Sequence, residues 1–189
     1  EIPSNRVVEI DELVAYHEAG HALVGSKLPD YDKVVRISIK PTSKGAGGFT
    51  KFQQRDKYLD GGMYDKNYLD NQIVVTLGGR AAEEIIYGVN KVTTGASADF
   101  QMANNLARQM IIQFGMNSNL GLMSIDPNNN LNSEDLKKNI DIAIKEIVSE
   151  SYVKACNIIN NNYDQFERLS KVLKRAKKLN SKHIKKLLY

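Results

Sequence analysis

The sequence predicts a mainly α-helical domain with a small β-sheet or hairpin and a C-terminal helical bundle. Most of the chain spaces its apolar side chains at helical intervals, one short segment alternates apolar and polar residues, and polar N-cap residues precede several helical segments. The 189 residues suit one domain, residues 1–189, and 42% hydrophobic with 25% charged residues is typical of a globular protein. A single cysteine excludes an internal disulfide framework.

The N-terminal part is expected to hold a helix followed by the sheet. Apolar spacing predicts a helix from Asp11 to about Leu28, and the alternation from Val34 to Lys40 predicts a half-buried strand. After a glycine-rich turn, Phe49 to Phe52 is expected to return as a short partner strand. Residues 53–65 show no clear period and are expected to form a loop.

A second helix is expected from about Leu69 to Tyr87, although it contains Gly78 and Gly79. Two adjacent glycines cost roughly 2 kcal/mol of helix propensity. We expect that another helix approaches closely at this point, because glycine has no side chain to hold a neighbouring backbone away.

The remaining helices are predicted from their caps and their apolar spacing. Ser97 is expected to cap a helix from Ala98 to about Phe114, and Ser133 to cap a long helix that ends near Asn160. A loop is expected at 127–130. A further helix begins near Tyr163, and Ser181 is expected to cap a last short helix.

The net charge of +4 comes from the end of the chain. The segment from Lys171 to Tyr189 contains eight Lys and Arg residues and no acidic residue, and the rest has 18 basic and 22 acidic residues. Apolar residues up to Leu179 keep helical spacing there, so we expect the lysines to face solvent. The charge therefore does not indicate a nucleic-acid partner, and no apolar run approaches the ~18 residues of a membrane span.

His17, Glu18 and His21 form the pattern HExxH in the first predicted helix. Residues four apart lie on one face of a helix, so both imidazoles can reach one ion. Glu18 lies about 100° from His17 around the helix axis, close enough to act as a general base on a water molecule. Zinc suits such a site because it accepts neutral imidazoles and lowers the pKa of water to around 7. About two in a thousand chains of this composition would contain the pattern by chance.

A catalytic zinc usually has three protein ligands. The extended pattern HExxHxxGxxH is absent, and the remaining histidine, His183, lies among lysines whose charge disfavours a metal. The third ligand should therefore be a carboxylate. Spacing leaves Glu83, Glu84 and Asp99 as equal candidates.

Three motifs occur in order: HEAGH at 17–21, LGGRAAEEIIYG at 77–88 and TTGASADF at 93–100. Together they resemble the peptidase domain of FtsH-type proteases, which are ATP-dependent, membrane-anchored zinc metalloproteases of bacteria, mitochondria and plastids. The resemblance begins at about Leu13 and includes the C-terminal helices. It implies a helical, zincin-like metalloprotease domain and an endopeptidase activity.

The resemblance also assigns roles to residues. It implies that Asp99 completes the zinc site with the two histidines, and that Glu83 orients a ligand imidazole. An extended peptide would add to the edge of the small sheet. The residues expected at this edge and its turn are Ile37, Ser38, Ile39, Gly47, Gly48 and Phe49. The zinc-site region would span about 11–125, and the C-terminal helices about 133–189.

The resemblance further implies parts and partners outside this chain. An attached ATPase would use ATP and deliver unfolded or membrane-derived polypeptides, since the chain has no GxxxxGK[ST] phosphate loop. The full-length protein would be a homohexamer anchored in a mitochondrial inner, plastid or bacterial inner membrane, whereas this fragment is expected to be soluble. The alternative is a non-catalytic metal-binding assembly module, against which the intact HExxH argues.

Overall fold

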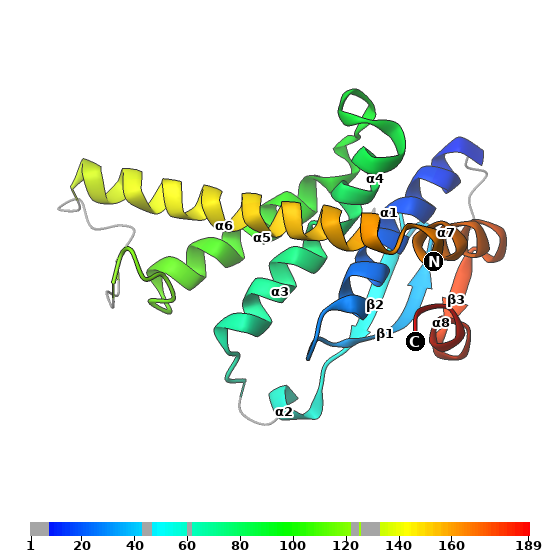
Figure 1. Cartoon of the computed structure of the whole chain (residues 1–189), viewed down its shortest axis with the longest axis horizontal. Helices are drawn as coiled ribbons and strands as arrows, with labels where there is room; N and C mark the ends of the chain where they lie inside the picture. Colours follow the sequence, from blue (N-terminus) through cyan, green and yellow to red (C-terminus); the bar gives the residue numbers. More distant parts are fainter. Residues whose placement is uncertain (1–7, 43–46, 60–61, 122–124, 126–132) are drawn as a thin grey trace.

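The computed structural model is a set of packed helices with a three-stranded antiparallel sheet at one end (Figure 1). It describes residues 8–42, 47–59, 62–121, 125 and 133–189. Most of these residues are helical, which confirms the predicted mainly α-helical class with a small sheet. The predicted loop at 127–130 and the turn residues Gly45 and Ala46 lie outside the described residues.

Helix α1 (Val8–Lys27) lies at the centre of the fold and carries both histidines of the HExxH pattern. Its buried face contains small residues such as Ala15 and Ala19, so neighbouring elements can pack close to its backbone. It contacts α4 (Gly78–Tyr87), α7 (Tyr163–Ala176) and the sheet. The histidines are therefore held by the best-packed element of the domain.

The predicted second helix is divided into two. Helix α3 (Lys66–Thr76) ends at Thr76, Leu77 lies between the two helices, and α4 begins at Gly78. The expected close approach is confirmed, because α1 and α4 touch at two glycines: a Cβ atom at Gly20 would lie 2.3 Å from the Gly78 carbonyl oxygen, and one at Gly78 would lie 2.9 Å from the Gly20 carbonyl oxygen. A side chain at either position would force the two helices apart.

The C-terminal half lies across these helices. The long helix α6 (Glu134–Asn161) runs across the molecule alongside α5 (Ser97–Ile112) and also packs on α3 and α4 (Figure 1). Ser133 caps α6 as predicted, since its hydroxyl accepts a hydrogen bond of 3.1 Å from the Leu136 amide. Helix α6 thereby supports the elements that supply the acidic residues of the site.

The sheet has the strand order β2-β1-β3. Strand β1 (Lys33–Ser38) is central, with β2 (Phe49–Gln53) on one side and β3 (Lys178–Asn180) on the other. The first two strands confirm the expected hairpin, whereas β3 has no counterpart among the expected elements. Leu179, whose spacing suggests a helix, is a buried residue of β3, because α7 ends at Ala176 and the next residue, Lys177, has a left-handed conformation with a φ of 62°.

Two predicted caps are displaced by one residue. Ser97 is the first residue of α5 rather than its cap, and the N-cap position is taken by Ala96, which has no polar side chain. Helix α8 (Ser181–Leu188) is capped by Asn180, whose side chain accepts from two backbone amides of the first turn at 3.1 and 3.2 Å. The Ser181 hydroxyl instead donates to the carbonyl oxygen of Val35 in β1 at 3.0 Å, so it ties α8 to the sheet.

The segment predicted as a loop at 53–65 contains a short helix, α2 (Asp56–Leu59). Tyr58 in this helix is buried, and its ring lies 4.2 Å from that of Tyr68 between ring centres. Burial of these aromatic rings provides the stability that the polar sequence of the segment does not suggest.

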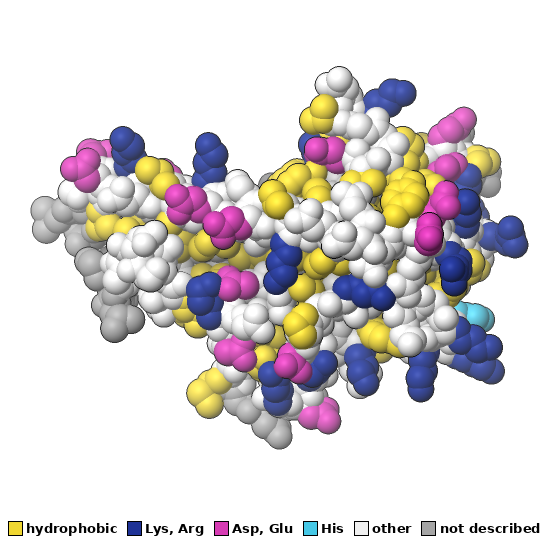
Figure 2. Space-filling model, viewed as in Figure 1, with side chains coloured by type: hydrophobic (Ala, Val, Ile, Leu, Met, Phe, Trp, Pro, Cys, Tyr) yellow, Lys and Arg dark blue, Asp and Glu magenta, His cyan; other side chains and the backbone are white. Residues whose placement is uncertain are grey.

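The prediction that the basic residues near the C-terminus face solvent holds for only part of them. In α7 and just after it, Lys174 pairs with Glu12, and Lys177 pairs with Asp11 at 2.6 Å, so these two lysines tie the segment to α1. The lysines of α8 are exposed, as predicted, and Figure 2 shows Lys and Arg side chains gathered at the lower right, over the end formed by α8 and β3. In the described part of the chain, no helix combines the length and the apolar character needed to cross a membrane.

Candidate active site

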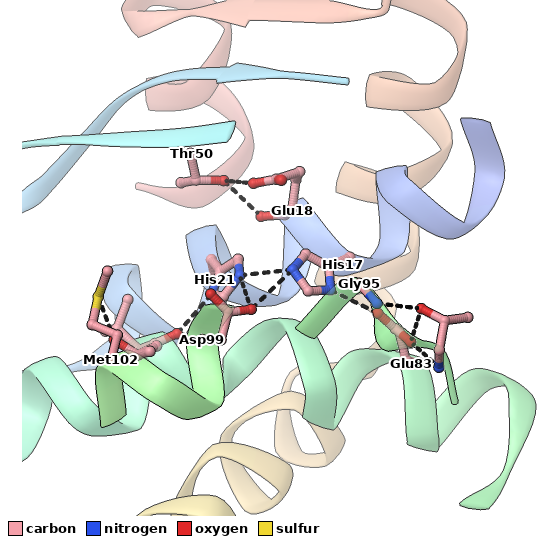
Figure 3. A network of polar contacts seen from close by, with 11 residues as sticks. His17, Glu18, His21, Thr50, Glu83, Gly95, Asp99 and Met102 are labelled. Atoms are coloured by element: carbon pink, nitrogen blue, oxygen red, sulfur yellow. Dashed lines mark hydrogen bonds and ion pairs between the residues drawn. The ribbon is translucent and has the colours of Figure 1, made fainter. Parts of the chain in front are cut away.

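Three side chains from two distant parts of the chain meet in one cluster (Figure 3). His17 and His21 project from α1, and Asp99 projects from the first turn of α5. The two histidine Nε2 atoms are 3.1 Å apart, and the Asp99 Oδ2 atom lies 3.2 Å from the Nε2 of His17 and 3.5 Å from that of His21. Among the described residues, this is the one group whose His, Cys, Asp or Glu atoms are arranged to hold a metal ion.

Each imidazole is oriented by a partner at its other nitrogen. His21 donates from Nδ1 to the Val75 carbonyl oxygen at 2.8 Å, and His17 Nδ1 contacts the Glu83 Oε1 atom at 2.8 Å. A carbonyl can only accept, so the Nδ1 of His21 carries the hydrogen and its Nε2 offers a lone pair when the ring is neutral. These contacts direct both Nε2 atoms towards Asp99.

Glu83 is itself held on both carboxylate oxygens. Its side chain is fully buried, and Oε2 accepts from the backbone amide of Thr93 at 2.9 Å and from its hydroxyl at 3.0 Å. The expected role in orienting an imidazole thus has a matching contact with His17. Thr93 was not expected to take part, although it lies in the TTGASADF segment that carries Asp99.

Gly79 faces the histidine pair. A Cβ atom at this position would lie 2.5 Å from the Cε1 atom of His17 and 2.6 Å from the Nε2 atoms of both His17 and His21. The two glycines of α4 therefore have different structural roles. Gly78 permits the close contact between α4 and α1, and Gly79 leaves space for the imidazoles of His17 and His21. Only the first role was expected from the sequence.

The charges of the cluster depend on one another. Burial lowers the pKa of His17, but contacts with Asp99 and Glu83 outweigh this and raise it to about 10. Burial raises the pKa of Asp99, but its contacts with His17 and His21 dominate and hold it well below its usual range. The buried Asp99 Oδ2 atom accepts no hydrogen bond of normal geometry from the described residues. A cation at this point would satisfy that oxygen and both Nε2 lone pairs.

Glu18 lies beside the cluster with its carboxylate buried, at 6% relative exposure. Thr50 in β2 donates from its hydroxyl to the Glu18 Oε2 atom at 2.8 Å and lies 3.0 Å from the Glu18 carbonyl oxygen. Burial raises the pKa of Glu18, and the neighbouring histidines and Thr50 offset this only in part. A carboxylate with a raised pKa is a better proton acceptor than an ordinary surface glutamate.

The cluster opens into a cleft of about 710 Å³ between α1, β2, α3 and α5. One wall is formed by the start of β2 and the residues before it, including Gly47, Gly48, Phe49 and Thr50. The opposite wall includes Met102, whose side chain is largely exposed. The cleft is therefore bordered by a strand edge on one side and a helix on the other.

The expectation for Ile37, Ser38 and Ile39 is wrong in one respect. β1 is the central strand and pairs with both neighbours through Ser38, so it has no free edge within this stretch. All three residues are buried, and none lines the cleft. The open edge beside the cluster belongs to β2, because β3, contributed by residues far along the chain, covers the other side of β1.

The structure separates the three carboxylates that spacing left equal. Asp99 joins the histidines, Glu83 lies behind His17, and Glu84 points away. Glu84 accepts a hydrogen bond of 2.6 Å from the hydroxyl of Tyr152 in α6. His183 is exposed on α8 and does not belong to the cluster, as expected.

Comparison with known proteins places the chain among peptidases. The model of peptidase family M41 matches residues 8–187. The chain is 41% identical over 180 residues to "ATP-dependent zinc metalloprotease FTSH 5, chloroplastic" of Arabidopsis thaliana, covering 87% of this chain and 25% of that protein. It is 39% identical over 188 residues to "ATP-dependent zinc metalloprotease FtsH 3" of Synechocystis sp., covering 93% of this chain and 30% of that protein. The chain thus spans between a quarter and three tenths of the length of these relatives.

Proposed function

The chain belongs to peptidase family M41, and we propose that it is the zinc-dependent endopeptidase domain of a longer protease. The observation that carries this proposal is the cluster of two Nε2 atoms and one carboxylate oxygen, from His17, His21 and Asp99, beside the buried carboxylate of Glu18. These groups line one cleft, so a metal, a base and a substrate can meet there.

The three atoms suit a zinc ion. A tetrahedral zinc with bonds of about 2.0–2.1 Å needs ligand atoms about 3.3 Å apart, and the three measured distances are 3.1, 3.2 and 3.5 Å. The set of two imidazoles and one carboxylate is also one that zinc accepts, with a position left for water or substrate. Zinc bound there supplies a Lewis acid that lowers the pKa of water to around 7 and polarises a carbonyl oxygen.

We assign Glu18 as the general base. It takes a proton from the attacking water and later delivers this proton to the leaving nitrogen, so the carboxylate is restored after each cleavage. Its burial and the resulting rise in its pKa favour this proton transfer. Glu83 holds His17 in the orientation that keeps Nε2 directed at the cluster.

We propose that an extended peptide adds to the open edge of β2. Phe49 and Thr50 lie in this strand beside the cluster, and Gly47 and Gly48, which precede it, also line the cleft. The backbone amides and carbonyls of β2 would bind any sequence in extended form, which suits an enzyme that acts on unfolded chains. The peptide would thereby lie across Glu18.

For the full-length protein we propose the organisation of the FtsH-type proteases that the sequence resembles. The relatives' names describe ATP-dependent zinc metalloproteases that are chloroplastic or come from cyanobacteria. We therefore propose an attached ATPase domain that uses ATP and delivers polypeptides, a membrane anchor, and a homohexameric assembly in a plastid or bacterial membrane. Mitochondria remain a proposed alternative for the compartment.

Proteolysis that depends on zinc is the expected result for this chain. Casein incubated with zinc-loaded protein should be degraded, a chelator should stop the degradation, and added zinc should restore it. Gel electrophoresis of the products measures all three conditions. A protein that binds stoichiometric zinc but leaves casein and short unfolded peptides intact would contradict the proposal and favour the non-catalytic metal-binding module.

Replacing Asp99 by alanine is expected to lower zinc affinity strongly. The loss should exceed the roughly 10- to 100-fold that follows from removing a residue that only hydrogen-bonds to a metal ligand. The substitution removes one of three ligand atoms and leaves the two imidazoles in place. Metal analysis after dialysis against a zinc buffer measures the effect. Glu84→Gln is the matched control and should bind zinc like the parent, because Glu84 faces Tyr152. Unchanged zinc content in Asp99→Ala would instead assign the third ligand to Glu83.

A further inference from the structure

The carboxylate of Glu18 has one recorded hydrogen-bond partner among the described residues, and that partner is Thr50. The hydroxyl of Thr50 lies 2.8 Å from the Glu18 Oε2 atom and 3.0 Å from the Glu18 backbone carbonyl oxygen (Figure 3). A hydroxyl has one hydrogen and two lone pairs, so it can donate to either oxygen and can also accept from a protonated carboxyl group. It therefore suits a base that gains and loses a proton in each turnover.

The backbone of Thr50 is fixed by the centre of the sheet. It pairs with Ile37 of β1, whose side chain is fully buried. The hydroxyl therefore projects from a rigid strand rather than from a loop. A side chain on a rigid element can define the position of another group more closely than one on a mobile segment.

Three alternate residues of β2 and its approach face α1. A Cβ atom at Gly48 would lie 3.0 Å from the Cγ atom of Glu18, Thr50 binds the Glu18 carboxylate, and the ring of Phe52 lies against Gly25. This alternation follows from the two-residue period of a strand. The missing side chain at Gly48 leaves room for the methylene groups of Glu18, and Thr50 limits where its carboxylate can lie.

We propose that Thr50 is a positioning residue for the general base, and that it connects Glu18 to the same strand whose outer edge receives the substrate. This inference rests on the proposed roles of Glu18 and of β2. Because one strand holds both the peptide backbone and the carboxylate, their separation stays constant when the cleft widens or narrows. The sequence alone did not indicate Thr50, since its link to Glu18 joins residues 32 positions apart.

Two substitutions distinguish the effect of the Thr50 hydroxyl group from the effect of the shape of its side chain. Thr50→Val keeps the branched side chain and removes the hydroxyl, whereas Thr50→Ser keeps the hydroxyl and removes the methyl group. In the zinc-loaded protein, Thr50→Val should lower kcat for a fluorogenic peptide by roughly 10- to 100-fold, the loss expected for a hydrogen bond to a charged group. KM and zinc content should stay close to those of the parent, and Thr50→Ser should recover most of kcat.

A spectroscopic measurement tests the same contact without cleavage. In protein with ¹³C-labelled glutamate side chains, the Glu18 carboxyl signal is identified by its absence from Glu18→Gln. We expect this signal to shift in Thr50→Val and to return towards the parent position in Thr50→Ser, with and without zinc. An unchanged signal in Thr50→Val, or equal losses of kcat in the valine and serine variants, would overturn the proposal. A parent protein that cleaves nothing would refute the proposed function, while the carboxyl signal would still decide whether Thr50 holds Glu18.

Discussion

Replacing Glu18 by glutamine is expected to lower peptide hydrolysis by roughly 10²- to 10⁴-fold, the range that a general base contributes. Glutamine has nearly the same shape as glutamate, and its amide can still contact Thr50, so the cleft should keep its form. It cannot take a proton from water at neutral pH. The three candidate ligand atoms belong to other residues, so one zinc per chain should remain bound.

The measurement pairs initial rates on a fluorogenic peptide with metal analysis of the same samples. Glu9→Gln is the matched control, because Glu9 is an exposed residue in the first turn of the same helix, and it should keep the parent rate and zinc content. A zinc-loaded Glu18→Gln protein with the parent rate would remove Glu18 from the mechanism. Loss of both zinc and activity would instead assign Glu18 to holding the metal.

Replacing Gly79 by alanine is expected to remove zinc binding while the helix remains formed. The added methyl carbon would lie 2.6 Å from the Nε2 atoms of both His17 and His21, so the imidazoles must move away from the position in which they face Asp99. Alanine is about 1 kcal/mol more favourable than glycine in a helix, so the substitution does not destabilise the helical backbone of α4. We expect zinc affinity to fall by more than about 100-fold, which exceeds the usual effect of removing a residue that hydrogen-bonds to a metal ligand.

The neighbouring glycine provides the contrast. Gly78→Ala places a methyl group 2.9 Å from the Gly20 carbonyl oxygen, so it should lower the free energy of unfolding by separating α1 from α4. Competition with a chromophoric chelator measures zinc affinity, and urea unfolding measures the free energy of unfolding. Gly79→Ala should lower the zinc affinity more than Gly78→Ala does, and Gly78→Ala should lower the free energy of unfolding more than Gly79→Ala does. Parent-like zinc affinity in Gly79→Ala would show that the imidazoles do not bind a metal in this arrangement.

The parts of the candidate site whose arrangement follows from the sequence are those that depend on local geometry. His17, Glu18 and His21 lie within five consecutive residues, so helical spacing alone places them together. Asp99 is far from them in the sequence, and spacing left it equal to Glu83 and Glu84. The packing of α4 on α1, and of α5 on α3 and α6, decides which carboxylate reaches the histidines.

The error about the substrate edge has the same cause. The resemblance placed the substrate edge at β1, and β3 was not expected because it is only three residues long and follows a strongly helical pattern. Its pairing joins Arg36 to Asn180, residues that lie 144 positions apart. Periodicity in a short window cannot reveal such a contact, and the identity of the central strand depends on it.

The placement of β3 also affects how copies of the domain behave towards one another. Strands with unpaired backbone groups tend to join those of other molecules, which leads to aggregation. The three residues Lys178–Asn180 cover one side of β1, and the residues of β2 on its other side border the cleft. The central strand β1 is therefore closed to pairing with another copy, and any pairing between copies must use the outer side of β2 or of β3.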